Sequence, residues 1–532
     1  MLLSSLTKVF PDETPKGAPL ATATLLQNER FSFQCVYHVP CDKEVTVAVN
    51  TALPARLFRV GCVQVPHPDR PDMPMDEDVL RLTPGRYPDV LYPVTEQTVP
   101  AEAGWNSLWV MVEGDLPVGE WPVTVTVDGH TDTCTLTVLG AALPPPALTY
   151  TAWFHTDCVA DYYHVPVFSE AHWTLLESYF RNAAEFGQTM LYVPLYTPPL
   201  DTPVDGERRT VQLLDITVKD GQYTFDFDRV ARWMQLALDC GFTAFEMPHL
   251  FTQWGAAACP KIFAHTDEGE RRIFGWDVAS DSDAYRAFLA QMLPALRAFL
   301  VEKGWLSRCV FHFSDEPNED NLSSYRRARD GAAPLLAGCQ TMDALSHYTF
   351  YEQGLVDLPV VATNAVAPFL QHHVKPLWVY YCCGQRDRVC NRFICQPSYR
   401  NRGLGFQLFM QDAAGFLQWG YNYWYSCLSG CLVDPFTGAP EDAPAFPAGD
   451  AYVVYPGADG PLPSLRQVVF GEALQDLRAC QALAGLTSRE EVEALIRESG
   501  CEFAFDAYLR SDEALLALRE TINLRIAAVV SA

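Results

Sequence analysis

Hydrophobic and polar residues alternate with a period of two in the first 145 residues of the chain. Apolar side chains occupy every second position of 31–37, and the alternation recurs in VTVAV (45–49), WPVTVTV (121–127) and TCTLTV (133–138). Successive side chains of a strand leave opposite faces of a sheet, so this pattern predicts an N-terminal antiparallel β-sandwich. The run LPPP at 143–146 then predicts a stiff linker, because proline has no N–H to donate to a sheet.

Beyond the linker, short apolar runs alternate with longer segments of helical period. The segment 227–240 shows this period, with Val230, Trp233, Met234 and Leu238 on one face. Helices on the outside require parallel strands inside, and eight such units close into a (β/α)8 barrel better than they form an open sheet. The eight expected strands are 150–154, 189–195, 242–247, 308–313, 339–342, 358–362, 377–382 and 421–425.

The connections between these strands also carry patterns. The segment 213–227 contains Lys219-Asp220-Gly221 between two alternating runs, which predicts a hairpin inserted into the second βα loop. The link between the fifth and sixth strands is weakly patterned, so the fifth helix is expected to be short or absent. The remaining expected helices are 170–186, 282–303, 322–336, 403–419, 465–483, 490–498 and 512–529.

These patterns predict three parts. Residues 1–145 form the β-sandwich, residues 146–485 form the (β/α)8 barrel with the helix 465–483 closing it, and residues 486–532 form a C-terminal helical extension. The fold class is therefore α/β, with a TIM-type barrel preceded by an antiparallel β-sandwich.

The charge of the chain restricts its partners. Lys and Arg number 38 against 65 Asp and Glu, a formal net charge of -27, which disfavours nucleic acid and anionic membranes as partners because like charges repel. The N-terminus lacks the apolar core of a signal peptide, and no window holds eighteen uninterrupted apolar residues. We therefore expect a soluble, cytoplasmic protein whose ligand is small or neutral.

The cysteines do not form a recognisable metal site or disulfide framework. Their number, 17, is odd, and several lie inside apolar runs, where a reduced thiol behaves as a small hydrophobe. The pairs Cys427/Cys431, Cys390/Cys395 and His372/His373 lack the spacing of a known zinc cage. Phosphate-binding, HExxH and GxSxG motifs are also absent, so no cofactor and no metal are expected.

Two adjacent carboxylates follow the expected fourth strand in the segment CVFHFSDEPNED. If 308–313 is a barrel strand, Asp315 and Glu316 lie just past its C-terminal end, where barrel enzymes carry their chemistry. Pro317 ends the ladder because it has no N–H. An acidic helix start is the structural alternative, since carboxylates favour the N-terminal end of a helix dipole.

Neighbouring acids divide labour when their surroundings separate their pKa values. The usual glycosidase schemes place two carboxyls on either side of the scissile bond, which suits sequence neighbours poorly. Adjacent acids instead suit substrate assistance, in which the 2-acetamido oxygen of the sugar attacks its own anomeric carbon. One acid would stabilise the resulting oxazolinium and the other would protonate the leaving oxygen.

Four segments carry a family resemblance: HFSDEP (312–317), WVYYCCGQ (378–385), GFLQWGYNYWY (415–425) and PSLRQVVFGEALQDLR (463–478). Their order and spacing resemble those of glycoside hydrolase family 123, over residues from about 150 to 485. The resemblance implies a β-sandwich followed by a (β/α)8 barrel and a retaining exo-β-N-acetylhexosaminidase of the N-acetylgalactosaminidase type. It further implies that Asp315 stabilises the oxazolinium, that Glu316 is the general acid/base, and that the substrate is a glycan or glycoside with a terminal N-acetylhexosamine.

Other residues near expected strand ends are candidates for substrate binding. Aromatic faces suit the C–H surface of a sugar, and polar groups at the mouth of a barrel are often functional. An aromatic strand in the core is the alternative for 421–425. The candidates are His155, His249, Asn364, Trp419, Tyr423, Trp424 and Tyr425.

Three further functions remain open on the sequence. The barrel could bind carbohydrate without turnover, since a fold does not guarantee activity. It could be a glycosidase for sugars that lack a 2-acetamido group. A metal-dependent hydrolase using His155, Asp157 and His249 is the third alternative.

Overall fold

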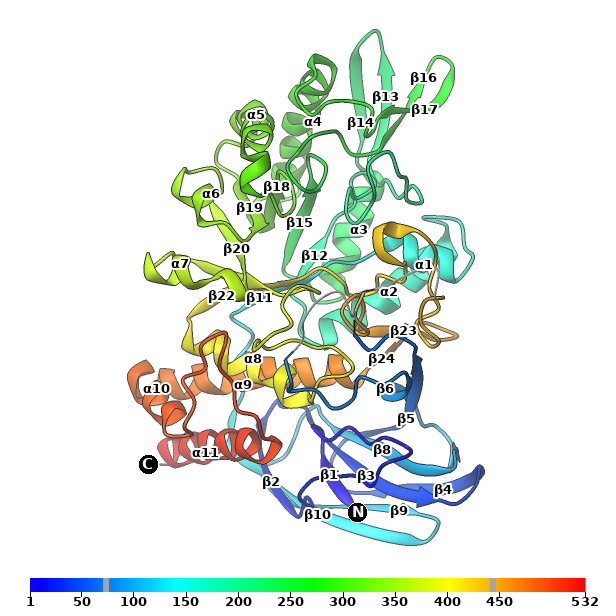
Figure 1. The fold of residues 1–532 in the computed structure, drawn as a ribbon, viewed down its shortest axis with the longest axis vertical. Helices are drawn as coiled ribbons and strands as arrows, with labels where there is room; N and C mark the ends of the chain where they lie inside the picture. The colour runs from blue at the N-terminus through cyan, green and yellow to red at the C-terminus, as the bar shows by residue number, and fades with distance from the viewer. Residues whose placement is uncertain (70–75, 441–445, 532) are drawn as a thin grey trace.

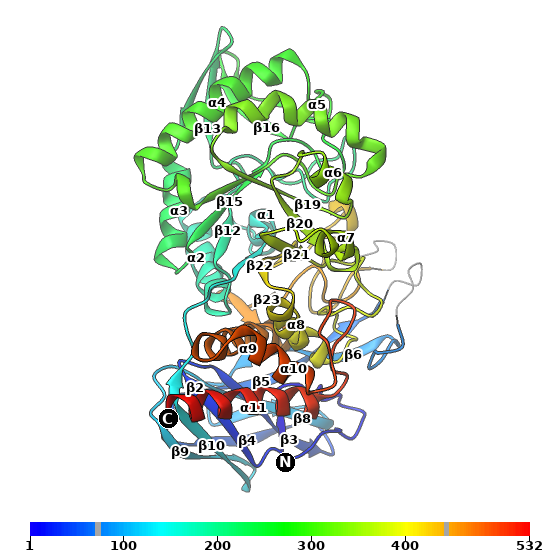
Figure 2. The same ribbon diagram turned by 90° about the vertical axis from the view of Figure 1, so that its left-hand side faces the viewer.

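The computed structural model describes residues 1–69, 76–440 and 446–531, and Figure 1 shows their arrangement. The N-terminal strands gather at one end of the molecule and the barrel at the other, with helix α9 (Leu465–Leu486) between them (Figure 1). The C-terminal helix α11 (Asp512–Val530) returns to lie along the N-terminal sheets, as Figure 2 shows. Both ends of the chain therefore meet at the same end of the molecule.

Two five-stranded sheets pack face to face at the N-terminal end. The apolar residues that alternate in the sequence, such as Phe33, Cys35, Val123 and Val125, share one core between the sheets. One sheet runs β1 (Leu2–Ser4), β3 (Phe31–Val39), β8 (Gly104–Val112), β5 (Ala55–Val65), β6 (Gly85–Pro93), and the other β2 (Thr22–Gln27), β10 (His130–Ala142), β9 (Gly119–Val127), β4 (Lys43–Asn50), β7 (Thr98–Ala101).

The prediction of wholly antiparallel sheets is wrong for one pair. Strand β2 runs parallel to β10, whereas the other pairs within these two sheets are antiparallel. Thr22 pairs with Thr135, and Leu25 with Val138. Strands β2 and β10 are far apart in the sequence, so no hairpin turn fixes their relative direction, and alternation does not encode it.

Eight parallel strands close into the predicted barrel. Each strand bonds only its two neighbours, and the eighth bonds the first through the register Thr149 to Gly415 and Ala152 to Gln418. The strands are β11 (Thr149–Ala152), β12 (Met190–Tyr192), β15 (Ala244–His249), β18 (Cys309–His312), β19 (Gln340–Leu345), β20 (Leu358–Ala362), β21 (Leu377–Tyr380) and β22 (Ala413–Gln418).

The eighth strand is not the one predicted. The segment 421–425 makes only isolated bridges, at Asn422 and Tyr425, and the strand β22 falls inside the expected helix 403–419. Helix α8 (Ser398–Met410) is buried on almost every side, so it shows no amphipathic period to mark its end. Gly415 also weakens the strand pattern, yet it is required, because a Cβ there would lie 2.0 Å from the Trp378 ring.

Helices cover the outside of the barrel between its strands. The predicted fifth helix is indeed short, since α6 (Tyr348–Glu352) has five residues. Besides α8, the others are α1 (Thr156–Tyr162), α2 (Glu170–Glu185), α3 (Asp228–Asp239), α4 (Asp283–Glu302), α5 (Leu322–Ala332) and α7 (Ala367–Gln371). Helix α9 follows β22 as expected, and a small ribbon of β23 (Val454–Pro456) and β24 (Pro461–Pro463) precedes it.

The predicted hairpin is present and is part of a larger insertion. Strands β13 (Asp215–Lys219) and β14 (Gln222–Asp226) turn at Asp220 and Gly221. Strands β16 (Ile262–Thr266) and β17 (Gly269–Phe274), from the loop after β15, extend them to a four-stranded sheet. The second hairpin was missed, because its sequence IFAHTDEGERRIF is mostly polar.

Buried charges connect the two ends of the chain to α9. Arg519 of α11 pairs with Asp476 at 2.7 Å and with Glu29 at 2.8 Å, and Arg402 of α8 bonds both Asp476 and Glu472. Helix α10 (Arg489–Arg497) completes the C-terminal helices. No helix in the described ranges combines the length and the apolar content needed to cross a bilayer.

Candidate active site

A pocket of about 660 Å³, part of it open to solvent, lies at the C-terminal mouth of the barrel. Its walls come from residues at or beyond the ends of β11, β12, β15, β18, β19, β21 and β22. Segments far apart in the sequence meet here because all eight parallel strands end at this face. Residues just past the ends of different strands can therefore line one pocket.

Asp315 and Glu316 both line this pocket and are half-buried. The Asp315 carbonyl accepts a 2.8 Å hydrogen bond from the Trp254 N–H, and the Glu316 N–H donates to the Ala344 carbonyl at 3.1 Å. Glu316 has φ 41°, in the left-handed region that non-glycine residues rarely adopt. A regular strand would send adjacent side chains to opposite faces, so this turn is what brings both carboxyls into one pocket.

Tyr380, at the end of β21, contacts the second acid. Its hydroxyl donates a 2.5 Å hydrogen bond to Oε1 of Glu316. Burial raises the pKa of Glu316, and this hydrogen bond opposes the rise. Burial and the charge of Glu316 raise the pKa of Asp315 well above its usual value. The two carboxyls titrate as a pair and retain a proton at a pH where isolated acids would both be ionised.

A histidine lies between two buried carboxylates in the barrel interior. His312 Nε2 is 2.8 Å from Glu246 Oε1, and its Nδ1 is 3.2 Å from Asp343 Oδ1. Burial lowers the pKa of His312, but the bonds to Asp343 and Glu246 outweigh it and raise the pKa to about 9. The resulting positive charge lowers the pKa of Asp315, so it favours the ionised form of that acid.

The Glu246 carboxylate that bonds His312 also positions one wall of the pocket. Glu246 accepts hydrogen bonds from the Trp153 indole and from Thr151, both at 2.7 Å. Trp153 lines the pocket and is only 4% exposed. The carboxylate that fixes His312 therefore also fixes an aromatic face inside the pocket.

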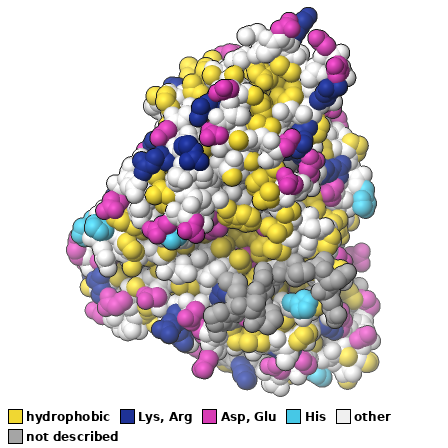
Figure 3. All heavy atoms as spheres, turned by 45° about the horizontal axis from the view of Figure 1, so that its top comes forward, with side chains coloured by type: hydrophobic (Ala, Val, Ile, Leu, Met, Phe, Trp, Pro, Cys, Tyr) yellow, Lys and Arg dark blue, Asp and Glu magenta, His cyan; other side chains and the backbone are white. Residues whose placement is uncertain are grey.

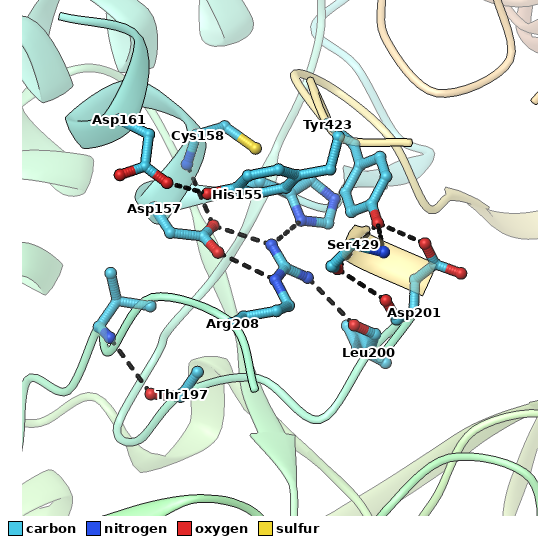
Figure 4. A network of polar contacts seen from close by, with 12 residues as sticks. His155, Asp157, Cys158, Asp161, Thr197, Leu200, Asp201, Arg208, Tyr423 and Ser429 are labelled. Carbon is cyan, nitrogen blue, oxygen red and sulfur yellow. Dashed lines mark hydrogen bonds and ion pairs between the residues drawn. The ribbon is translucent and has the colours of Figure 1, made fainter. Parts of the chain in front are cut away.

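Figure 4 shows a second polar network behind the pocket wall. Arg208 and Asp157 form a buried ion pair of 2.8 Å, with exposed side-chain fractions of 1% and 2%, and Arg208 Nη2 is 3.2 Å from His155 Nδ1. Tyr423 donates a hydrogen bond to Asp201, which itself lines the pocket (Figure 4). This network supports the loop that follows β12.

Most of the predicted substrate-binding residues lie outside the pocket. Of the seven, only Trp419 lines the pocket, where its indole donates to Asp450 at 3.0 Å. His155 and Tyr423 belong to the network behind the wall, Asn364 is exposed and bonds Gln385, and the others are buried away from the pocket. These others are His249, against His312 and Trp153; Trp424, bonded to Val454; and Tyr425, bonded to Asp161.

The proposed metal triad of His155, Asp157 and His249 does not form. His155 and Asp157 bond Arg208, whereas His249 packs against His312 with the ring centres 4.4 Å apart and the rings tilted by 33°. In the described ranges, the potential ligands that gather within 4.8 Å are instead His249, His312 and Asp343. His312 is already bonded on both ring nitrogens by Glu246 and Asp343, which suits a cationic imidazole and not a metal ligand.

Several pocket residues were missed from the sequence. Asp201, Gln253 and Trp254 lie in long loops without a pattern, and Tyr380 lies in an expected barrel strand for which no site residue was predicted. The other lining residues that were missed are Trp153, Leu200, Ala344, Cys382, Cys383, Leu417 and Phe446. A polar or aromatic residue at a strand's last position is the signal that could have identified Tyr380.

Comparison with known proteins decides the family. The model of the glycoside hydrolase 123 catalytic domain matches residues 153–483, which include the pocket and both acids. The chain belongs to glycoside hydrolase family 123. A search among curated proteins finds no match.

A solved structure of a family 123 enzyme has a similar fold. A family 123 glycoside hydrolase from Clostridium perfringens, described in work on glycolipid glycan hydrolysis, superposes with a TM-score of 0.72 and 14% identity, covering 100% of this chain and 97% of that one. A β-glucuronidase from Bacteroides uniformis reaches a TM-score of 0.31 with 10% identity, over 81% of this chain and 47% of that one. At 14% identity the likeness to the Clostridium perfringens enzyme concerns the fold alone.

Proposed function

We propose that this family 123 chain is a retaining exo-β-N-acetylhexosaminidase that uses the 2-acetamido group of its substrate as the nucleophile. One observation carries the proposal: Asp315 and Glu316, adjacent in the sequence, line one pocket together. Carboxyls on consecutive residues cannot flank a scissile bond from opposite sides, as direct displacement requires. They can act together on one side, where the substrate supplies the attacking oxygen.

Glu316 is assigned as the general acid. It gives its proton to the glycosidic oxygen as the bond from that oxygen to the anomeric carbon breaks, while the acetamido oxygen bonds to the same carbon. In the second step Glu316 takes a proton from the water that opens the oxazolinium, so the proton balance closes. The raised pKa of Glu316 fits this role, since an acid must hold its proton near neutral pH.

Asp315 is assigned as the stabiliser of the oxazolinium. Its carboxylate would accept the hydrogen bond of the acetamido N–H and balance the positive charge that develops on the ring. The free pair holds a shared proton, and a bound acetamido N–H favours leaving that proton on Glu316. The cationic His312 favours the same distribution, because it stabilises an ionised Asp315.

The surface charge does not oppose a glycan substrate. On the face in Figure 3, acidic and basic side chains are interspersed and hydrophobic side chains gather in patches between them. Neutral sugars bind through apolar faces and a few placed polar groups, which the pocket supplies in Trp153, Trp419 and Tyr380.

A panel of 4-nitrophenyl glycosides tests the proposal. We expect hydrolysis of a β-N-acetylhexosaminide, in the galacto or gluco form, and inhibition by an N-acetylhexosamine thiazoline, which mimics the bicyclic intermediate. Activity only on a glycoside without an acetamido group would reject the mechanism. Binding of N-acetylhexosaminides without hydrolysis would indicate a carbohydrate-binding barrel.

Variants of the two acids sharpen the test. Glu316→Gln should lower kcat by roughly 10²- to 10⁴-fold while leaving inhibitor binding, and Asp315→Asn should weaken both. Asp320→Asn is the matched control, because Asp320 is an exposed acid of the same loop and lies outside the pocket. Equal losses in all three variants would show a general disturbance of the loop.

A further inference from the structure

Two cysteines that are adjacent in the sequence lie in the wall of the pocket. Cys382 and Cys383 come just past the end of β21, and both line the pocket that contains Glu316. Both are free thiols and both are partly exposed. No other cysteine among the described residues lines this pocket, and no other two cysteines are neighbours in the sequence.

A turn brings the two side chains to the same side of the chain. The Gln385 N–H donates to the Cys382 carbonyl at 3.2 Å, and the Cys382 N–H donates to the Gln385 side chain at 2.8 Å. The Asn391 amide also donates to the Cys382 carbonyl, at 3.0 Å. In a regular strand adjacent side chains leave opposite faces, so this turn is what allows both thiols to line one pocket.

The two thiols contact each other. The hydrogen bond with the Cys383 side chain, burial and the charge of Glu316 raise the pKa of Cys382 well above its usual value. The Cys382 thiol therefore keeps its proton. Because the thiolate is the reactive form of a cysteine, attack on an external sulfur falls to Cys383.

Packing alone does not explain this pair. A buried thiol such as that of Cys158 or Cys480 acts as a small hydrophobic side chain in the core. Cys382 and Cys383 differ because they are partly exposed, touch each other and lie in a pocket that small molecules can enter.

We propose that Cys382 and Cys383 form an oxidation site, at which a low-molecular-weight disulfide converts the two thiols into a disulfide between neighbouring residues and reversibly inactivates the pocket. This inference goes beyond the proposed function. It adds a covalent modification of the chain and names the class of oxidant.

The reaction is a thiol–disulfide exchange in two steps. The Cys383 thiolate attacks one sulfur of the external disulfide, which forms a mixed disulfide and releases one thiolate. Cys382 Sγ then attacks Cys383 Sγ and gives its proton to the released thiolate, while the second half of the oxidant leaves as a thiolate. The two thiols of the chain lose one electron pair, and the external disulfide gains it.

The new bond would be easy to reduce. Adjacent Cα atoms are about 3.8 Å apart, whereas the Cα atoms of unstrained disulfides are roughly 4.4–6.8 Å apart. A disulfide between neighbours is therefore strained, and strained disulfides are the labile ones. The pair should stay reduced while thiols are abundant and close only when disulfides accumulate.

Oxidation would disturb the contact between Tyr380 and Glu316. Closing the ring rotates the peptide unit between Cys382 and Cys383, and this unit includes the carbonyl that Gln385 and Asn391 hold. Tyr380 lies two residues before Cys382 and donates its 2.5 Å hydrogen bond to Glu316. A change in the turn thus reaches the hydroxyl that contacts the proposed acid.

Glutathione disulfide serves as the probe for the full-length chain. The reduced protein is treated with an excess of this oxidant, and one sample is then reduced again with dithiothreitol. The mass of the peptide that contains both cysteines and the rate of hydrolysis of a 4-nitrophenyl β-N-acetylhexosaminide are measured at each stage. The variants are Cys382→Ser and Cys383→Ser, with Cys41→Ser as the control, because Cys41 is exposed and lies outside the pocket.

We expect the wild-type peptide to lose two hydrogens and the rate to fall about tenfold, as for the loss of a hydrogen bond to a charged group. Dithiothreitol should restore both. Cys383→Ser should keep the rate of its own reduced form, and Cys382→Ser should stop at the mixed disulfide, with glutathione on Cys383. Cys41→Ser should behave as the wild type.

Three outcomes overturn the inference. The wild-type peptide could stay reduced while Cys41 reacts, or it could carry glutathione without an internal disulfide, and in either case the two thiols are not an oxidation site. If the internal disulfide forms and hydrolysis is unchanged, the pair does not control the pocket. If the reduced wild type hydrolyses no N-acetylhexosaminide, the proposed function fails and the inactivation with it, whereas the peptide mass still decides whether the bond forms.

Discussion

The Tyr380 hydroxyl and the Glu316 carboxyl are joined by a hydrogen bond of 2.5 Å across the mouth of the barrel. The donor comes from β21 and the acceptor from the loop after β18, so the bond connects two segments 64 residues apart. It ties the proposed acid to a rigid strand.

Tyr380→Phe should shift the pH profile of the enzyme. The hydroxyl stabilises the ionised form of Glu316, and its loss should raise the pKa of that acid by roughly one to two units, given the usual strength of a hydrogen bond to a charged group. A general acid is lost as pH rises through its pKa, so the basic limb of kcat/KM should move to higher pH.

Tyr381→Phe is the matched control for this shift. Tyr381 is the next residue, is 1% exposed, and its hydroxyl has no hydrogen-bond partner among the described residues. Its profile should coincide with that of the wild type. A Tyr380→Phe profile with lower kcat but an unmoved basic limb would contradict the assignment of Glu316 as the acid.

His312→Asn should remove a pH-dependent part of the stability. The pKa of His312 is raised to about 9 in the folded chain from an ordinary 6.5, so its contribution is complete below pH 6.5 and is lost as pH rises through 9. Removing one partner of a buried charge group costs roughly 3–5 kcal/mol. Urea unfolding should therefore show a large deficit at pH 6 that shrinks by pH 9, whereas exposed His130→Asn should show none.

Asp450→Asn should increase the stability of the protein relative to the wild type as pH rises. Burial raises the pKa of Asp450 from 3.8 to about 7, so the stability of its protonated form is complete below pH 3.8 and is lost as pH rises through 7. Asparagine stays neutral and keeps an oxygen to accept the Trp419 indole N–H. Relative to the wild type, the variant should gain about 3–4 kcal/mol between pH 4 and 8.

Chemical denaturation at pH 4 and pH 8 checks this gain. Asp220→Asn, in the exposed turn between β13 and β14, serves as the control and should give the same difference at both pH values. Equal stability changes for Asp450→Asn at the two pH values would show that Asp450 is ionised throughout.

Gly255→Ala should lower the free energy of unfolding more than the same substitution at Gly221. A Cβ at Gly255 would lie 2.4 Å from Asn321, the residue that holds the Trp254 carbonyl. Gly221 also has positive φ, at 75°, but has no atom within 4 Å of the same position. Gly221→Ala should cost about 1–2 kcal/mol from the backbone alone, and Gly255→Ala roughly 1–3 kcal/mol more.

The activity of the two glycine variants separates the cost of backbone strain from an effect on the position of the catalytic acids. Gly255→Ala should lower kcat/KM, because the Trp254 N–H also bonds the Asp315 carbonyl. Gly221→Ala should leave kcat/KM unchanged. If both variants retain full activity after correction for unfolded protein, the loop of Trp254 does not position the acids.

Much of the fold follows from local patterns, because seven barrel strands are short apolar runs bounded by turns or helices. The eighth strand could not be found in this way. Glycine has a low strand propensity, but at position 415 it is needed because a side chain there would collide with Trp378. The aromatic run at 421–425 has the composition of a strand but makes only isolated bridges. Tertiary packing, and not the local sequence pattern, determines the secondary structure of both segments.

The site was predictable where chemistry follows a strand directly. Asp315 and Glu316 come within four residues of the end of β18, so their place at the mouth follows from the barrel. Trp254 and Asp201 reach the pocket from loops whose course depends on contacts such as the Gln253 bond to Thr202, which no local pattern encodes. His249 is the last residue of β15, yet it faces the interior, where burial and the charge of His312 lower its pKa.

The charged groups shared by Glu29, Arg519 and Asp476 limit how the protein can be divided. A cut in the proline run would leave the barrel fragment with arginine and aspartate side chains fitted to a carboxylate that is no longer there. Anyone transplanting this barrel into a fusion protein would have to carry its first and last segments along, or redesign the seam with apolar residues of similar volume.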